Sequence, residues 1–203
     1  MCRLLETMMI VDGTIRNAEY HNTRMNAARR ELFHLRDELD VRELAGGGNG
    51  LHGLVRCRLV YGETVFSVTH EEYIRQPVRS LQLVRRDDIS YQHKFEERSQ
   101  FADALRQRNE CDEILIVKHD TLTDTSFSNV AFFREDIWVT PAEPLLKGTM
   151  RASLLDRGMI VEEDIRVSDL AHFSQVMLIN ALRDFNLRET LDISAVSTRG
   201  FLP

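Results

Sequence analysis

The chain has 203 residues, of which 43% are hydrophobic, and a formal net charge of −6 arises from 32 acidic and 26 basic side chains. This length is sufficient for one large or two small hydrophobic cores, so we expect a chain that is folded throughout. The charges are spread without a long block of one sign, which excludes the usual signatures of nucleic-acid and membrane-surface binding.

The sequence contains no apolar run approaching the roughly 18 residues of a membrane-spanning helix. No signal-peptide core follows Met1-Cys2-Arg3. We therefore expect a cytoplasmic protein without membrane or nucleic-acid partners. The cysteines Cys2, Cys57 and Cys111 are far apart and odd in number, unlike a disulfide framework or a zinc site. Reduced cysteines and no metal site are predicted.

A β-hairpin followed by an amphipathic helix is predicted at the start of the chain. Residues Leu4 to Ile10 form an apolar, β-compatible run, and Asp12-Gly13 before Ile15 is a strong hairpin signal. From about Asn22 to Leu39, apolar residues recur at the three-and-four spacing of a helix, with Asn22 as the N-cap. The apolar stripe consists of Met25, Ala28, Leu32, Leu35 and Leu39.

The first half is predicted to continue as a sheet. The run from Gly46 to Gly50 lacks the Lys-Ser/Thr of a phosphate-binding loop and precedes no clear helix, so we interpret it as a flexible connection. The segments Leu54 to Val60, Thr64 to Val68 and Leu81 to Val84 indicate a β-meander. These elements predict an N-terminal α/β domain of order β-β-α-β-β-β over residues 1–88.

Residues 89–203 contain a new set of elements and predict a second, C-terminal domain. Its helices are expected from about Glu96 to Gln107 and from Thr149 to Arg157, where Gly158 ends the second helix. Its predicted strands are Glu113 to Val117, Val130 to Phe133, Ile137 to Thr140, Met159 to Ile165 and Gln175 to Ile179. The second and third of these strands are expected to form a hairpin.

Arg24 breaks the helical pattern because it lies one turn before Ala28 and continues the apolar stripe. A buried guanidinium needs an anion, and its planar fork of donors suits a phosphate or a carboxylate. Two interpretations stay open at this point: a bound anion, or an internal salt bridge with a local Glu or Asp.

Two further segments are unusual in their polar residues. The segment Lys147-Gly148-Thr149-Met150-Arg151 places small residues at a helix start, where N–H groups and the helix dipole favour an anion, although Thr is also an ordinary N-cap. The polar run from Thr121 to Asn129 contains one carboxylate, Asp124, which could pair with a protonated heterocyclic nitrogen. A plain polar turn is the alternative.

Taken together, these segments resemble the class IV aminotransferase family, the fold type IV enzymes that use pyridoxal 5′-phosphate (PLP). Leu5-Glu6-Thr7 through Asp12-Gly13, followed by His21-x-x-Arg24, is similar to the family's N-terminal signature. Residues 123–129 are similar to its Glu-x-x-x-x-Asn loop, with Asp124 in place of the glutamate. Thr140-Pro141, followed by Leu146-Lys147-Gly148-Thr149-Met150-Arg151, is similar to its Thr-Pro and Gly-x-x-Arg segment.

The resemblance implies an α/β (α+β) fold of two domains: a small N-terminal α/β domain and a C-terminal domain with a mixed, barrel-like sheet, with the cofactor between them. It implies that Lys94 is the Schiff-base lysine and that Asp124 keeps the pyridine nitrogen protonated. These two residues are the implied catalytic pair. The implied cofactor-binding residues are Arg24, Lys94, Asp124, Ser128, Asn129, Gly148, Thr149, Asn180 and Ala181.

Four other residues are candidates for binding a substrate carboxylate or the cofactor hydroxyl. Arg56 and Arg58 alternate along one predicted strand and so share a face, where they would bind a carboxylate or meet surface acids. His93 and Arg98 lie beside Lys94 in the sequence, and the alternative for both is an exposed position.

The segment Ile179-Asn180-Ala181-Leu182 resembles the Asn-Ala-Leu of the lyase branch, so 4-amino-4-deoxychorismate lyase is the leading interpretation. Alternatives are a branched-chain or D-amino acid aminotransferase, a catalytically silent protein that binds PLP or a metabolite, and a cofactor-free interaction domain. The chain is shorter than expected for the family, so loops over the substrate would be trimmed. The family leads us to expect a homodimer and a small-molecule amino substrate.

Overall fold

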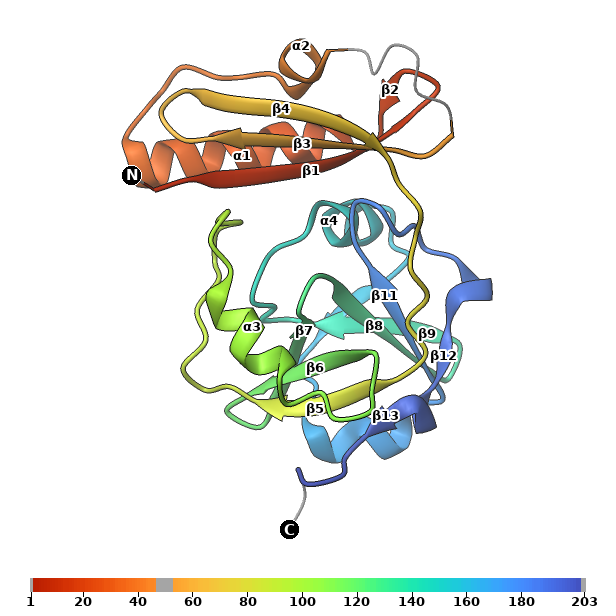
Figure 1. Ribbon diagram of the computed structural model, residues 1–203. Helices are drawn as coiled ribbons and strands as arrows, with labels where there is room; N and C mark the ends of the chain where they lie inside the picture. The colour runs from red at the N-terminus through yellow and green to blue at the C-terminus, as the bar shows by residue number, and fades with distance from the viewer. Residues whose placement is uncertain (1, 47–52, 202–203) are drawn as a thin grey trace. The chain divides into compact units, whose positions relative to one another are not determined.

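The computed structural model describes residues 2–46 and 53–201, which form two compact units (Figure 1). Unit 1 comprises Met1–Gln76 and His93–Glu97, and unit 2 comprises Pro77–Gln92 and Arg98–Pro203. The division therefore differs from the expected ranges of 1–88 and 89–203, since the chain leaves unit 1 earlier and returns to it once. Apart from Gly46, the predicted flexible connection lies outside the described residues.

Unit 1 contains an antiparallel sheet of order β2-β1-β3-β4. Its strands are β1 (Leu4–Val11), β2 (Thr14–Ile15), β3 (Val55–Tyr61) and β4 (Val65–Glu72). The predicted hairpin is confirmed: Asp12 and Gly13, with φ of 49° and 75°, connect β1 to β2. Positive φ at both turn positions matches the right-handed twist of the strands and favours this dipeptide.

Helix α1 (Ala18–Phe33) lies along one face of this sheet, together with α2 (Val41–Ala45) (Figure 1). The prediction of Asn22 as the N-cap is wrong, because the helix starts earlier and Asn17 is its N-cap. The Asn22 side chain instead accepts a hydrogen bond from the Val41 amide at 2.8 Å, at the start of α2. His34, with φ of 57°, ends α1, so Leu35 and Leu39 lie beyond the helix.

Unit 2 contains two sheets with parallel and antiparallel pairs. One has the order β13-β5-β6-β7 and the other β10-β9-β8-β11-β12. The first consists of β5 (Leu81–Arg85), β6 (Glu113–Lys118), β7 (Thr121–Thr125) and β13 (Val196–Ser197). The second consists of β8 (Asn129–Arg134), β9 (Ile137–Pro141), β10 (Val161–Glu163), β11 (Gln175–Ile179) and β12 (Leu191–Asp192). The mixed sheets agree with the fold class that the sequence predicted.

Two strand predictions are corrected in unit 2. Leu81 to Val84 does not complete a meander with β3 and β4, because β5 pairs in parallel with β6 and β13. The polar run from Thr121 is not a loop throughout, because its first five residues form β7, antiparallel to β6. The predicted hairpin of β8 and β9 is confirmed.

Short helices complete unit 2. Helix α3 (Ser99–Leu105) is shorter than predicted, whereas α4 (Thr149–Asp156) agrees with the prediction and is followed by Gly158 with φ of 64°. Three 3₁₀ helices, Val167–His172, Leu187–Glu189 and Ile193–Ala195, lie between the later strands. Of the predicted strand from Met159 to Ile165, the described strand covers Val161–Glu163.

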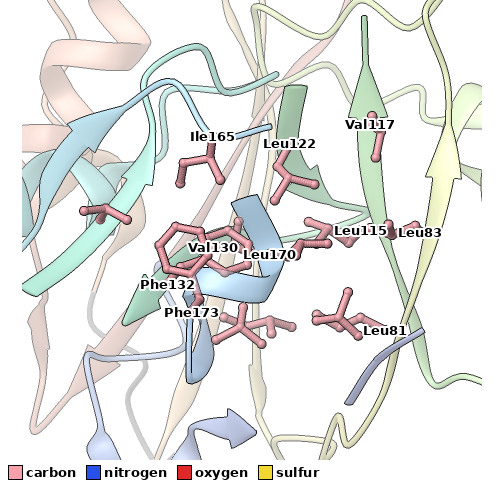
Figure 2. Packing of buried hydrophobic residues seen from close by; sticks show 14 residues of the cluster. Leu81, Leu83, Leu115, Val117, Leu122, Val130, Phe132, Ile165, Leu170 and Phe173 are labelled. Carbon is pink, nitrogen blue, oxygen red and sulfur yellow. The ribbon is translucent and has the colours of Figure 1, made fainter. Parts of the chain in front are cut away.

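The principal core of unit 2 lies between its two sheets, as Figure 2 shows. Leu83 and Leu115 come from one sheet, and Val130 and Phe132 come from the other. A second cluster, which includes Trp138, Met150 and Leu154, packs α4 against the five-stranded sheet. Helix α4 thus has a fixed place at the end of the loop that follows β9.

Within residues 2–46 and 53–201, no helix combines the length and apolarity needed to cross a membrane. In the same ranges, no group of three or more His, Cys, Asp or Glu side chains is arranged to hold a metal ion. The three cysteines are free thiols, and burial raises the pKa of Cys57 to about 11.

Phe132→Ala should destabilise unit 2 by about 3–5 kcal/mol, because it removes a large side chain from a closed core. Phe132 is fully buried, and its ring centroid lies 5.1 Å from that of Phe173. Urea unfolding followed by the fluorescence of Trp138, the single tryptophan, measures this change. The control, Ile137→Ala at a side chain that is 51% exposed, should be nearly neutral. Equal effects of the two variants would contradict this placement of the core.

Candidate functional site

A buried carboxylate lies beneath α1 in unit 1. Glu6, on β1, has no exposed surface and faces the helix side of the sheet. Arg24 donates to it twice, from Nε to Oε1 at 2.9 Å and from Nη2 to Oε2. His21, one turn before Arg24, places Nδ1 2.6 Å from Oε2. The structure therefore contains the internal salt bridge that was one of the two interpretations of Arg24.

The charges around Glu6 determine its protonation. Burial alone would raise the pKa of Glu6, but Arg24 and His21 together lower it to about 2 from an ordinary value of 4.5. Burial lowers the pKa of His21, although Glu6 acts in the opposite direction. Glu6 is therefore ionised, and His21 is neutral and donates from Nδ1. The contribution of Glu6 to stability is complete above its ordinary pKa and is lost as pH falls toward 2.

Lys94 belongs to unit 1 and lies at an edge of β1. The Leu5 amide donates to the Lys94 carbonyl at 2.8 Å, and the Glu96 amide donates to the Arg3 carbonyl at 3.0 Å. Phe95 forms a bridge with Leu4 and packs against the core beneath α1. The positive charge of Lys94 also contributes to lowering the pKa of His21, so these groups interact electrostatically. The backbone thus fixes Lys94 beside the strand that carries Glu6.

Asp124 is the corresponding buried carboxylate of unit 2. Its Oδ1 accepts from Asn129 Nδ2 at 2.8 Å, and its Oδ2 accepts from the Leu146 amide at 2.9 Å. Asn129 Nδ2 also donates to the Leu146 carbonyl at 2.8 Å. β7, β8 and the loop before α4 therefore meet at this carboxylate.

Asp124 lacks the cationic partner that Glu6 has. Burial raises its pKa from 3.8 to about 7, although its hydrogen bonds and the charge of Arg151 act in the opposite direction. Arg151 itself pairs with Glu162 and the Pro141 carbonyl. In the described part of the chain, neither oxygen of Asp124 bonds to a lysine or an arginine. A carboxylate has about four acceptor positions, so it retains capacity for another donor.

The pairing of β8 with β11 brings two other predicted residues to the same part of unit 2. Asn129 lies opposite Ile179, and Asn180 Nδ2 donates to Ser128 Oγ at 2.9 Å. Asn180 Oδ1 accepts from the Leu182 amide at 2.8 Å, which closes a turn around Ala181. Register between strands far apart in the sequence therefore assembles this group.

The start of α4 lies directly beside Asn129. A Cβ atom added at Gly148 would overlap Asn129 Oδ1, so only glycine fits the present packing. Thr149 is buried as the first residue of α4, and the first turn contains no acidic side chain. The positive end of the helix dipole therefore lies near the Asp124 cluster. Seven of the predicted residues belong to this part of unit 2: Asp124, Ser128, Asn129, Gly148, Thr149, Asn180 and Ala181.

The four substrate-binding candidates have different surroundings. Arg56 pairs with Glu71 at 2.7 Å and stacks on Tyr73, which agrees with the surface-acid interpretation. Arg58 shares its face and lies in register between Thr7 and Thr69. The remaining two have protein partners as well. His93 Nε2 lies 3.4 Å from Glu31 Oε1, and Arg98 donates to the Ser126 carbonyl.

Sequence reasoning missed two buried carboxylates. Glu6 was noted only as part of a motif, although an acid inside the otherwise apolar run of β1 was a usable signal. Glu113 is also buried and accepts from the amide and hydroxyl of Ser126 at 3.2 and 2.9 Å. Glu113 lies at the start of β6 and gave no such signal, because its partner Ser126 lies in the turn between β7 and β8.

Comparison with known proteins gives the family. Residues 67–186 match the amino-transferase class IV family. An uncharacterized protein of Haemophilus influenzae is 34% identical over 190 residues, which cover 90% of this chain and 98% of that protein. A crystal structure from Haemophilus somnus 129pt, given the provisional name 4-amino-4-deoxychorismate lyase, has a TM-score of 0.84 and 30% identity. That match covers 91% of this chain and 98% of the other.

Two further similarities agree with this result. A Schizosaccharomyces pombe protein with the provisional name aminodeoxychorismate lyase is 36% identical over 83 residues, 38% of this chain and 36% of that protein. The PLP-bound form of a hypothetical aminotransferase from Mycobacterium tuberculosis has a TM-score of 0.73 at 18% identity, and so shares the fold. It covers 89% of this chain and 78% of the other.

The chain belongs to the amino-transferase class IV family. Its mixed α/β architecture is that of fold type IV, as the sequence predicted. The prediction of an enzyme of the aminotransferase and lyase class is confirmed at the level of this family. The family implies PLP as the cofactor.

The raised pKa of Asp124 predicts how the stability of the apoprotein depends on pH. Between pH 3.8 and about 7 the folded state binds more protons than the unfolded state, so the free energy of unfolding should fall as pH rises. Asp124→Asn should lose this dependence, and the two profiles should diverge by on the order of 2 kcal/mol from pH 5 to pH 8.

Urea unfolding of the two apoproteins at several pH values measures this difference. The substitution also replaces one acceptor by a donor, but that effect is the same at every pH and leaves the slope unchanged. Parallel profiles would contradict the protonation of Asp124 described above.

Proposed function

We propose that the protein is a PLP-dependent enzyme that acts on an amino substrate in the manner of a 4-amino-4-deoxychorismate lyase, with Lys94 as the residue that binds the cofactor. The observation that carries the proposal is the similarity to the Haemophilus somnus protein, which extends over nearly the whole of both chains at 30% identity. The similarity to the Schizosaccharomyces pombe protein supports the same activity.

Several predicted residues have the chemistry that PLP requires. Asp124 is a buried carboxylate whose pKa is raised to about 7 by burial, and a protonated pyridine nitrogen would supply a cationic partner. The guanidinium of Arg24 and the start of α4 both favour a phosphate. Lys94 supplies a primary amine for an aldehyde. We propose these roles in addition to the protein contacts already described.

The proposed roles of the other residues follow from their contacts. Asn129 holds Asp124 by its side chain and so orients the carboxylate. Ser128 and Asn180 bond to each other, and we propose that they and Ala181 supply donors at the phosphate. Gly148 permits close approach at the helix start because a side chain there would meet Asn129.

In the proposed reaction, Lys94 moves the proton of the substrate Cα, first as a base and then as an acid. When bound, PLP supplies the electron sink that makes this proton acidic. Asp124 supports that role by keeping a proton on the ring nitrogen. Loss of a β-leaving group would then give pyruvate and an aminobenzoate.

An amino acid aminotransferase is the second candidate function. A Mesorhizobium loti crystal structure with the provisional name amino-acid aminotransferase has a TM-score of 0.74 at 25% identity. That match covers 91% of this chain and 97% of the other. Both reactions begin with removal of the same proton, so product analysis has to separate them.

The test supplies the purified, PLP-loaded protein with 4-amino-4-deoxychorismate alone and, separately, with amino donors and 2-oxoglutarate. Pyruvate and aminobenzoate without a keto acid would support the lyase. Glutamate in the second assay alone would replace the lyase by the aminotransferase. PLP binding without either product would identify a catalytically silent protein, and failure to bind PLP would end the proposal.

Lys94→Ala should abolish the absorbance of the lysine-bound cofactor and reduce turnover by about 10²- to 10⁴-fold, because the covalent bond and the proton transfer are both lost. The sequence contains three lysines, so Lys118→Ala and Lys147→Ala complete the set of controls. Borohydride reduction followed by peptide mass spectrometry identifies the modified lysine. A label on Lys118 or Lys147 would contradict the assignment.

A further inference from the structure

We propose that Glu6 is a positioning residue that fixes the guanidinium of Arg24 for the phosphate of the cofactor, and so makes binding selective for phosphorylated ligands. The inference rests on the proposed function, in which Arg24 binds that phosphate. It assigns a role to a buried carboxylate that touches neither substrate nor cofactor in the proposal.

The contacts of Glu6 define the orientation of Arg24. Glu6 accepts from two different nitrogens of the guanidinium, Nε and Nη2, which fixes the plane of the group as well as its position. The opposite edge, at Nη1, is then oriented away from Glu6. Arg24 lies on α1 and Glu6 on β1, so the contact also ties the helix to the sheet.

His21 makes the arrangement more rigid. It shares Oε2 with Arg24 and comes from the preceding turn of α1, so both donors approach Glu6 from one helix. Glu6 and His21 are almost completely buried, whereas the Arg24 side chain is 17% exposed. The anchor is therefore inside the unit, and the arginine reaches its surface.

The charge of Glu6 has two possible effects on Arg24. Glu6 is ionised and His21 is neutral, so Glu6 places one negative charge beside the guanidinium. If Glu6 only neutralised Arg24, it would weaken phosphate binding, and replacing it by a neutral residue would strengthen that binding. If Glu6 positions Arg24, the same replacement would weaken phosphate binding.

The experiment compares the dissociation constants of pyridoxamine 5′-phosphate and pyridoxamine by titration calorimetry. The two ligands share a ring and differ in the phosphate, and neither requires the covalent bond to Lys94. Glu6→Gln offers one acceptor oxygen to three N–H donors and should free the guanidinium. The freed Arg24 side chain would regain rotamer freedom, which it must lose again when it binds the phosphate. The affinity for the phosphorylated ligand should therefore fall about tenfold, and the affinity for pyridoxamine should stay unchanged.

Two further variants make the result interpretable. Glu6→Asp keeps the buried charge but shortens the reach, so positioning predicts a loss similar to that of Glu6→Gln, and it also guards against failure of the amide variant to fold. Glu19→Gln removes a carboxylate from an exposed position of the same helix, where Glu19 pairs with Arg42, and should leave both dissociation constants unchanged.

The possible outcomes separate this inference from the proposed function. If both Glu6 variants lose affinity for pyridoxamine 5′-phosphate but not for pyridoxamine, the result supports positioning. Unchanged or tighter binding of that ligand, or equal losses for both ligands, overturns positioning while the proposed function stands. A wild-type protein that binds neither ligand, or binds both equally, overturns the role of Arg24 in the proposed function and this inference with it.

Discussion

The burial of the Asp124 carboxylate is the constraint on which the arrangement of unit 2 around the candidate site depends. A charge in a region of low dielectric needs nearby donors or a cation, and here the donors come from Asn129 and the backbone before α4. Asn129 can approach both Asp124 and Leu146 because residue 148 is a glycine. One carboxylate thereby links β7, β8 and the loop before α4.

Glu6 and Asp124 are both buried carboxylates, but their pKa values are shifted in opposite directions. Burial acts to raise the pKa of both, but Arg24 and His21 lower the pKa of Glu6 overall, whereas Asp124 has only neutral donors bonded to it and its pKa is raised. Glu6 therefore forms a complete ion pair with Arg24, which suits it to fixing the orientation of that side chain. Asp124 still lacks a positive charge, which is the property that a site for a cationic ring requires.

The match to two Haemophilus proteins extends over nearly the whole of their lengths. The relatives from Haemophilus influenzae and Haemophilus somnus are each covered to 98% of their length, whereas the Mycobacterium tuberculosis aminotransferase is covered to 78%. Lys94, Asp124 and the start of α4 lie on regular elements or are fixed to their edges. Side chains on such elements are held more precisely than side chains on loops.

The sequence by itself determined the elements whose signals are local: the Asp12-Gly13 hairpin, the pair of β8 and β9, α4 before Gly158, and the motifs that indicate the family. It did not determine that β5 joins β6 or that Glu6 lies beneath Arg24. Those features depend on partners distant in the sequence. Turn residues and caps act on their neighbours, whereas strand pairing, burial and the pKa of a carboxylate are decided only when the chain brings separate segments together.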